Sequence, residues 1–130
     1  MELQITQEVK EKIEAKRQTG DRIFLDFEDG DGPFAATGIT CRLDLSFRLL
    51  LVAQDYPEEG LAVYDDTIET VIGAIRLKKS SEKYLEAETI LAYNPTYNNI
   101  QLKGKSGVLA DNVPIIRYDR QMAGGGKWGD

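Results

Sequence analysis

Cys41 is the only cysteine in the sequence, and it lies in a glycine-led stretch that runs into a long alternating apolar segment. The chain contains no histidine, so the usual pairing of a nucleophile with an imidazole base cannot be assembled. No second cysteine is present to share a disulfide or to complete a soft ligand set. Any thiolate chemistry or soft-metal binding by this sequence must therefore pass through Cys41.

The sequence pattern leaves two environments open for Cys41. If the following strand already includes residue 41, the thiol shares the apolar face of Leu43 and Leu45 and behaves as a small buried hydrophobe. If the strand begins at Arg42 or Leu43, the thiol lies in the loop after Gly38, where the guanidinium of Arg42 favours the thiolate. The pattern alone favours the buried environment, because free cysteines are usually buried.

An acidic stretch at 26–32, Asp-Phe-Glu-Asp-Gly-Asp-Gly, is a second place to look for a metal site. Calcium and iron both accept several carboxylate oxygens from a tight loop. The EF-hand pattern fails here, because the twelfth position counted from Asp26 or Asp29 is Thr37 or Thr40 instead of glutamate. We therefore interpret this stretch as a solvated hairpin turn whose Asp and Gly residues serve backbone geometry.

Two further motifs give no reactive site. The stretch Gly124-Gly125-Gly126-Lys127 lacks the Ser or Thr that follows the lysine of a phosphate loop, and no strand precedes it. Paired carboxylates at 58–59 and 65–66 lie in turns, where adjacent side chains point apart, and we interpret them as solubility features. With no nucleophile, base and orienting group to combine, the protein is predicted not to be an enzyme.

Charge and length limit the kinds of partner. The 22 acidic side chains outnumber the 16 basic ones, and the resulting net charge of -6 repels nucleic-acid phosphates and anionic lipids. The first residues show no basic segment followed by an apolar core, and no apolar run approaches a membrane span. These observations lead us to expect a cytoplasmic protein. We also expect one domain, because 130 residues suit a single hydrophobic core.

One helix is predicted, at the N-terminus, over residues 6–19. Thr6 is placed to cap it, Val9 and Ile13 form a narrow apolar stripe, and Gly20 ends it. Such a thin stripe can only pack on a larger core built elsewhere in the chain. That core must come from strands.

The longest period-two run predicts a central strand over residues 43–51. Its polar residues, which include Ser46 and Arg48, share one face, and the other face carries Leu43, Leu45, Phe47, Leu49 and Leu51. Shorter strands are predicted at 23–28, 61–64, 67–71, 74–78, 89–93, 99–103 and 113–118, with a short helical turn at 80–84. The fold class is therefore mainly β (α+β), with seven or eight short strands in a single domain at 1–122 and a flexible glycine-rich tail at 123–130.

Three segments occur in an order found in a known family: the opening helix at 5–13, the cysteine loop and strand at 38–47, and Tyr-Leu-Glu-Ala-Glu-Thr-Ile-Leu-Ala-Tyr at 84–93. In these segments the sequence resembles HesB-like proteins, the A-type iron-sulfur carriers, with a likeness running from about residue 3 to residue 116. It is most similar to a short bacterial subgroup of iron-sulfur cluster biosynthesis proteins, through the stretch at 25–34. The resemblance implies a HesB-like pseudobarrel of mixed strands, usually dimeric, that receives iron or a cluster and passes it to apo-proteins.

The chain departs from this family in its ligands. A-type carriers have a Cys-Gly-Cys pair near the C-terminus, and the matching stretch at 104–113 contains no cysteine. Cys41 is thus the one metal ligand that the resemblance implies, whereas a two-iron cluster ordinarily needs four ligands, mostly thiolates. Oxygen ligands from Asp111 or the acidic stretch, or small thiols, would fill the gap only weakly. We therefore expect no iron-sulfur cluster to be stably bound in the purified protein.

The resemblance implies a non-enzymatic protein of iron-sulfur cluster assembly. It would handle iron or a cluster weakly and transiently, or act as an accessory that binds assembly proteins or apo-protein acceptors, alone or as a homodimer. The alternative is a HesB-like fold relative without metal chemistry that binds another protein or a small ligand. Cys41 separates the two hypotheses, because a transfer site must expose its sulfur to iron or to a partner thiol.

Overall fold

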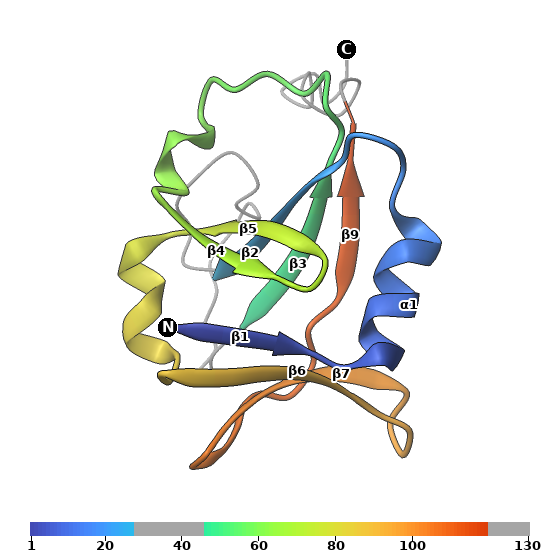
Figure 1. The fold of residues 1–130 in the computed structure, drawn as a ribbon, viewed down its shortest axis with the longest axis vertical. Coiled ribbons are helices and arrows are strands. Elements are labelled where there is room, and N and C mark those ends of the chain that lie inside the picture. The colour runs from blue at the N-terminus through green and yellow to red at the C-terminus, as the bar shows by residue number, and fades with distance from the viewer. Residues whose placement is uncertain (28–45, 120–130) are drawn as a thin grey trace, which may run out of the picture.

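The computed structural model describes residues 1–27 and 46–119. Within these ranges the chain forms two β-sheets, one α-helix and two short 3₁₀ helices (Figure 1). The predicted mainly β (α+β) class is confirmed, and the strands described form two separate sheets that do not close into one barrel. Cys41, the acidic residues at 28–32 and the glycine-rich tail lie outside the described residues.

The larger sheet has five strands in the order β4-β5-β2-β3-β9. β2 is antiparallel to β3 and parallel to β5, while β9 runs parallel to β3. Strands β2 and β3 are interior and are buried on both faces, which explains their nearly continuous apolar sequences. The bounds are β2 Arg22–Phe27, β3 Phe47–Val52, β4 Asp66–Thr70, β5 Gly73–Leu77 and β9 Ile115–Tyr118.

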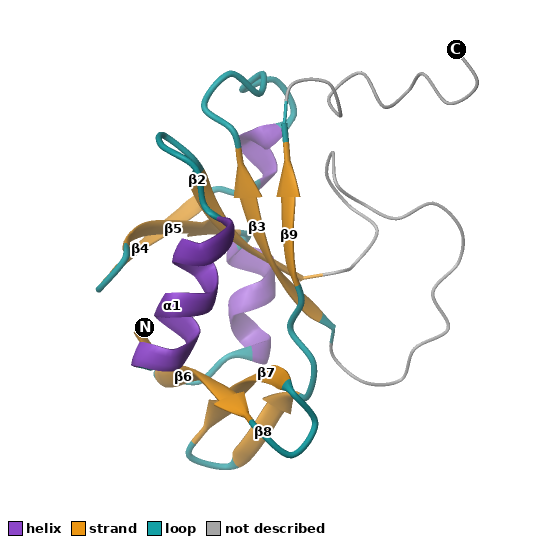
Figure 2. Ribbon diagram, turned by 90° about the vertical axis from the view of Figure 1, so that its right-hand side faces the viewer, coloured by secondary structure: helices purple, strands orange, loops and turns teal. Residues whose placement is uncertain are grey.

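The smaller sheet has four strands in the order β1-β6-β7-β8. β1 is parallel to β6, and the other pairs are antiparallel. Figure 1 shows β1, β6 and β7 passing below the five-stranded sheet, and Figure 2 shows β8 beside β7 at the same end. The bounds are β1 Glu2–Ile5, β6 Glu88–Asn94, β7 Asn99–Gly104 and β8 Gly107–Ala110.

Helix α1 spans Gln7–Lys16 and covers one side of the junction between the sheets (Figure 2). As predicted, Thr6 caps it, because its hydroxyl accepts a hydrogen bond from the backbone N–H of Val9 at 3.4 Å. Val9 and Ile13 are fully buried in the core. The helix ends three residues before the predicted bound, because Arg17 adopts an extended backbone. No helix in the described ranges is long and apolar enough to cross a membrane.

The differences from the predicted elements have local causes. The strand predicted at 61–64 is wrong: Leu61–Val63 is the 3₁₀ helix η1, entered from Gly60, whose φ of 87° turns the chain sharply. The helical turn predicted at 80–84 is confirmed as η2, Lys79–Tyr84. The sequence pattern does not predict β1 and β8, because each has only four residues and so few residues give no clear alternation.

Strand β3 separates two groups of buried side chains. Leu49 and Leu51 belong to the larger group between the two sheets, which also includes residues of α1. Leu50 and Val52 point to the other face and belong to a second group, with Phe24, Tyr56, Leu61 and Tyr64. The face that sequence analysis assigned as polar is therefore buried, because residues 53–64 fold back over it.

Asp21 ties the start of β2 to β9. Its buried carboxylate accepts hydrogen bonds from Nε and Nη2 of Arg117 at 2.8 and 2.9 Å, and from the backbone N–H of Gln18 at 2.9 Å. Burial by itself would raise the pKa of Asp21, but the hydrogen bonds from Arg117 and Gln18 outweigh it and hold the pKa below its ordinary value. Asp21 is thus stabilised as the anion in the folded state.

Leu50→Ala should lower the free energy of unfolding by about 2–5 kcal/mol, because it opens a cavity in the second group of buried side chains. Val71→Ala, in the exposed turn between β4 and β5, is the control and should change it by no more than about 0.5 kcal/mol. Urea unfolding measures both variants. Equal stabilities would show that this face of β3 is not a core.

Asp21→Asn tests the Asp21–Arg117 pair through its pH dependence. Because the folded-state pKa of Asp21 is lowered, the stabilisation is complete above its unfolded pKa of about 3.9 and is lost as the pH falls through the folded-state pKa. The stability difference between wild type and Asp21→Asn should therefore be constant from pH 7 to about pH 5 and shrink below about pH 4. Urea titrations at each pH measure this difference, and Glu59→Gln is the control for the change in net charge. A stability difference that stays the same at every pH would contradict the assignment.

Candidate functional site

The segment that contains Cys41 joins two paired strand ends. Phe27, the last residue of β2, lies opposite Phe47, the first residue of β3, in the antiparallel register. Cys41 itself is outside the described residues, so neither its metal-ligand role nor its burial is tested by the structure. What the structure describes is the pair of strand ends from which this segment departs and to which it returns.

A buried carboxylate lies at these strand ends. Asp26, next to the end of β2, accepts hydrogen bonds at Oδ2 from Nε of Arg48 at 3.1 Å and from Nη2 of the same guanidinium. Its Oδ1 accepts a hydrogen bond from the Tyr64 hydroxyl at 2.8 Å and lies 3.4 Å from Nζ of Lys78. One carboxylate thus joins β2 to β3, to the residue after η1 and to the residue after β5.

The charges in this cluster are almost fully removed from water. Asp26 is 1% exposed, Lys78 2% and Arg48 6%. Such burial is tolerated only where opposite charges and hydrogen bonds replace the lost hydration. Lys78 also donates to the backbone carbonyl of Phe27 at 3.3 Å, so the cluster holds the last residue before the Cys41 segment. The interpretation of Asp26 as part of a solvated turn is wrong, because this residue lies inside β2 and its carboxylate is buried.

Aromatic side chains hold the same strand ends on the other side. The ring of Phe27 lies 5.0 Å from that of Phe47 and 4.6 Å from that of Tyr84, centroid to centroid. Contacts of this kind add to the energy of apolar burial. The ends of β2 and β3 are therefore fixed both by a buried ion cluster and by aromatic packing.

The described residues do not fit a resident iron-sulfur cluster. Within residues 1–27 and 46–119 no group of three or more cysteine and carboxylate side chains could hold a metal ion. Asp111, which sequence analysis considered as a weak oxygen ligand, accepts a hydrogen bond from Nε2 of Gln101 at 2.6 Å. The carboxylate of Asp26 already pairs with Arg48 and Lys78, and their positive charges disfavour the binding of a metal cation to the same carboxylate.

The sequence pattern does not predict that Arg48, Lys78 and Tyr64 form a cluster with Asp26. A usable signal was present for Arg48, because a charged residue inside an otherwise apolar strand must find a buried partner when both faces are covered. No comparable signal marks Lys78. It lies in the sequence between β5 and η2, two short elements, where a lysine is ordinarily expected at the surface. Only the three-dimensional fold brings these residues to Asp26.

Asp26→Asn should lower the free energy of unfolding by about 3–5 kcal/mol, because it leaves the buried guanidinium of Arg48 and ammonium of Lys78 without this counter-charge. Glu88→Gln is the matched control, since Glu88 pairs with Lys105 at the exposed surface, and should cost at most about 1 kcal/mol. Chemical denaturation compares the two variants. A loss for Asp26→Asn as small as that of the control would contradict the buried cluster.

Two solved structures share this fold. A protein proposed to act in Fe-S biosynthesis, from Lactobacillus salivarius, is 24% identical, with a TM-score of 0.76 over 92% of this chain and 99% of its own. A second protein proposed to act in Fe-S biosynthesis, from Lactobacillus acidophilus, is 14% identical, with a TM-score of 0.67 over 95% of this chain and 93% of its own. No curated protein matches the sequence. At these identities the two structures establish a common fold.

The sequence itself matches the family described as "Iron-sulphur cluster biosynthesis" over residues 1–117. The match includes both described sheets, except the last residue of β9, and the connection that contains Cys41. It confirms the predicted resemblance to HesB-like proteins and supports a role in iron-sulfur cluster assembly. With nine-tenths of its length matched, this chain belongs to the iron-sulphur cluster biosynthesis family.

Proposed function

We propose that this protein acts in cytoplasmic iron-sulfur cluster assembly without being an enzyme. It holds iron or a cluster briefly as cargo, through the thiolate of Cys41, and docks with assembly proteins or apo-protein acceptors. The observation that carries the proposal is the family match, which spans the connection containing Cys41. The buried cluster at Asp26 supports it, because it fixes the two strand ends that flank this connection.

The number of ligands explains why the cargo would be held only briefly. One chain contributes one thiolate and a symmetric pair contributes two, whereas a two-iron cluster ordinarily takes four protein ligands. The other ligands must come from the donor, from the acceptor or from small thiols. Bonds to ligands of that kind exchange readily, so incomplete coordination favours transfer over storage.

Asp26, Arg48 and Lys78 have a positioning role in this proposal. Arg48 and Lys78 both pair with the carboxylate of Asp26 inside the protein, and none of the three is proposed to touch the cargo. They fix the ends of β2 and β3, the two strands between which Cys41 lies in the sequence. The thiol is thereby presented from a rigid base.

The single cysteine also favours a second candidate function. A family member that lacks the C-terminal Cys-Gly-Cys pair could have lost metal chemistry and retained the fold as a module that binds a protein or a small ligand. The two functions differ in what Cys41 does. Iron retention and thiol accessibility therefore separate them.

Anaerobic addition of ferrous iron and sulfide, followed by absorbance spectra and iron analysis, tests the first function. The protein as purified should carry no chelator-resistant cluster, because four soft ligands cannot come from one cysteine per chain. After reconstitution the wild type should retain iron that a chelator removes, and Cys41→Ser should retain markedly less. Equal iron retention by both proteins would exclude Cys41 as the ligand.

Alkylation of the native protein, followed by mass spectrometry, tests the accessibility of Cys41. A transfer thiol should react at a rate near or above that of a free thiol at neutral pH, because a thiolate near Arg42 is the reactive form. Unfolded protein provides the reference rate, and Cys41→Ser provides the blank. Protection that is lost only on unfolding would favour the binding module without metal chemistry.

A further inference from the structure

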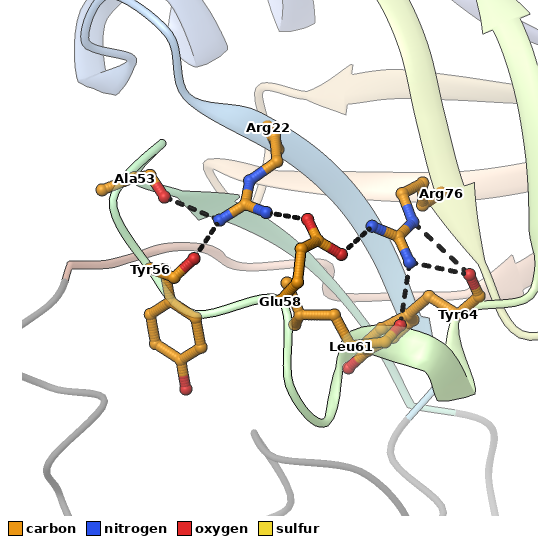
Figure 3. Close-up of polar contacts among 7 residues, drawn as sticks. All are labelled: Arg22, Ala53, Tyr56, Glu58, Leu61, Tyr64 and Arg76. Carbon is orange, nitrogen blue, oxygen red and sulfur yellow. Dashed lines mark hydrogen bonds and ion pairs between the residues drawn. The ribbon is translucent and has the colours of Figure 1, made fainter.

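Two arginines and one glutamate form a second polar cluster, distant in sequence from Cys41 (Figure 3). Arg22 is the first residue of β2, Arg76 lies in β5, and Glu58 lies in the loop between β3 and η1. We propose that Arg22 and Arg76 form a binding site for a carboxylate, and that the side chain of Glu58 fills this site when no ligand is present. The site would take an acidic side chain of a protein partner or a free polycarboxylate.

The two guanidinium groups converge on one point. β2 and β5 are parallel neighbours with Phe24 opposite Arg76, so Arg22 and Arg76 project from the same face of the sheet. Nη1 of Arg22 bonds to Oε2 of Glu58, and Nη1 of Arg76 bonds to Oε1 at 3.2 Å. Figure 3 shows the single carboxylate bridging the two groups.

Each guanidinium is held in place by other contacts. Nη2 of Arg22 donates to the carbonyls of Ala53 and Tyr56 at 2.9 and 2.8 Å, and Nη2 of Arg76 donates to that of Leu61 at 2.9 Å. These carbonyls belong to residues 53–64, which cover the second group of buried side chains. Both Nη1 groups are therefore oriented toward the same anion by the protein, which lowers the entropy lost when a ligand binds.

Stacking fixes Arg76 further. Its guanidinium carbon lies 5.1 Å from the centroid of the Phe24 ring, which is fully buried. A guanidinium can stack on an aromatic ring in this way and still present its in-plane N–H groups to a carboxylate. An ammonium cannot do both, so Arg76→Lys should remove the site without removing the charge.

Glu58 is the exposed and replaceable member of the cluster. Its side chain is 65% exposed, whereas those of Arg22 and Arg76 are 24% and 27% exposed. The resident carboxylate therefore lies on the solvent side, and rotation of its side chain opens the site without moving a strand. Exposed ion pairs of this kind are weak, so an incoming carboxylate can compete with it.

Charge balance favours an anionic ligand. Two guanidinium groups face one carboxylate, which leaves this cluster with one excess positive charge in a chain whose net charge is -6. Guanidinium groups match the planar carboxylate with paired hydrogen bonds. The resident ligand is itself a carboxylate, so the geometry already present is the geometry that the proposed ligand would use.

Glu58→Ala, which removes the resident carboxylate, provides the test. Acetate, citrate and a short glutamate-rich peptide are titrated at constant ionic strength, and the side-chain Nε–H signals of Arg22 and Arg76 are followed by NMR. Saturable shifts should appear for at least one polycarboxylate, with an affinity roughly two- to thirtyfold higher in Glu58→Ala than in wild type, the factor expected on releasing two exposed ion pairs. Glu59→Ala is the matched control for lost charge in the same loop and should bind as wild type does.

The double variant Glu58→Ala with Arg76→Lys should lose the saturable shifts at Arg22, while its backbone amide spectrum verifies that the fold is intact. Binding of the peptide without citrate would identify a partner side chain as the ligand, and binding of citrate would identify a free polycarboxylate; either supports the site. Absence of saturable shifts with every probe at millimolar concentration would overturn the proposal. Shifts that persist unchanged in the double variant would overturn it as well.

Discussion

The arrangement of the larger sheet depends on the hydrogen bonds and ion pairs of the buried Asp26 carboxylate. Its partners come from β3, from the residue after η1 and from the residue after β5, so a single side chain connects segments from across the chain. Buried ion clusters add less net stability than their Coulomb energy suggests, because every charge has lost its hydration. They do penalise wrong arrangements strongly, since any register that separates the partners leaves an uncompensated charge inside the protein.

This constraint bears on the family's chemistry. The connection that contains Cys41 departs from Phe27 and returns to Phe47, and both are held by the ion cluster or by aromatic packing. A rigid base suits a thiol that must meet donors and acceptors at a defined place. In the proposed function the described residues support this thiol, and most ligands of a two-iron cluster come from other molecules, because the sequence has one cysteine.

The other end of the same sheet face has a different character. There, Arg22 and Arg76 bind the carbonyls of the loop that covers Phe24 and Leu50, and they meet the exposed carboxylate of Glu58. Burial makes Asp26 a fixed structural anion, whereas exposure makes Glu58 replaceable. The same pair of residue types, arginine with carboxylate, thus supports the architecture at one end of this face and forms a proposed recognition site at the other, because solvent screens only the second.

Sequence alone determined the mainly β class, the capped N-terminal helix and most strand positions, since Thr6 and the alternating leucines act through local geometry. It also established that Cys41 is the one available thiol. The tertiary structure decided which faces are buried. The sequence pattern places Arg48 on a polar face of its strand, but residues 53–64 cover that face in the structure. It also decided that Asp26 is a buried partner of Lys78, because their contact depends on the pairing of β2 with β5, which no local pattern encodes.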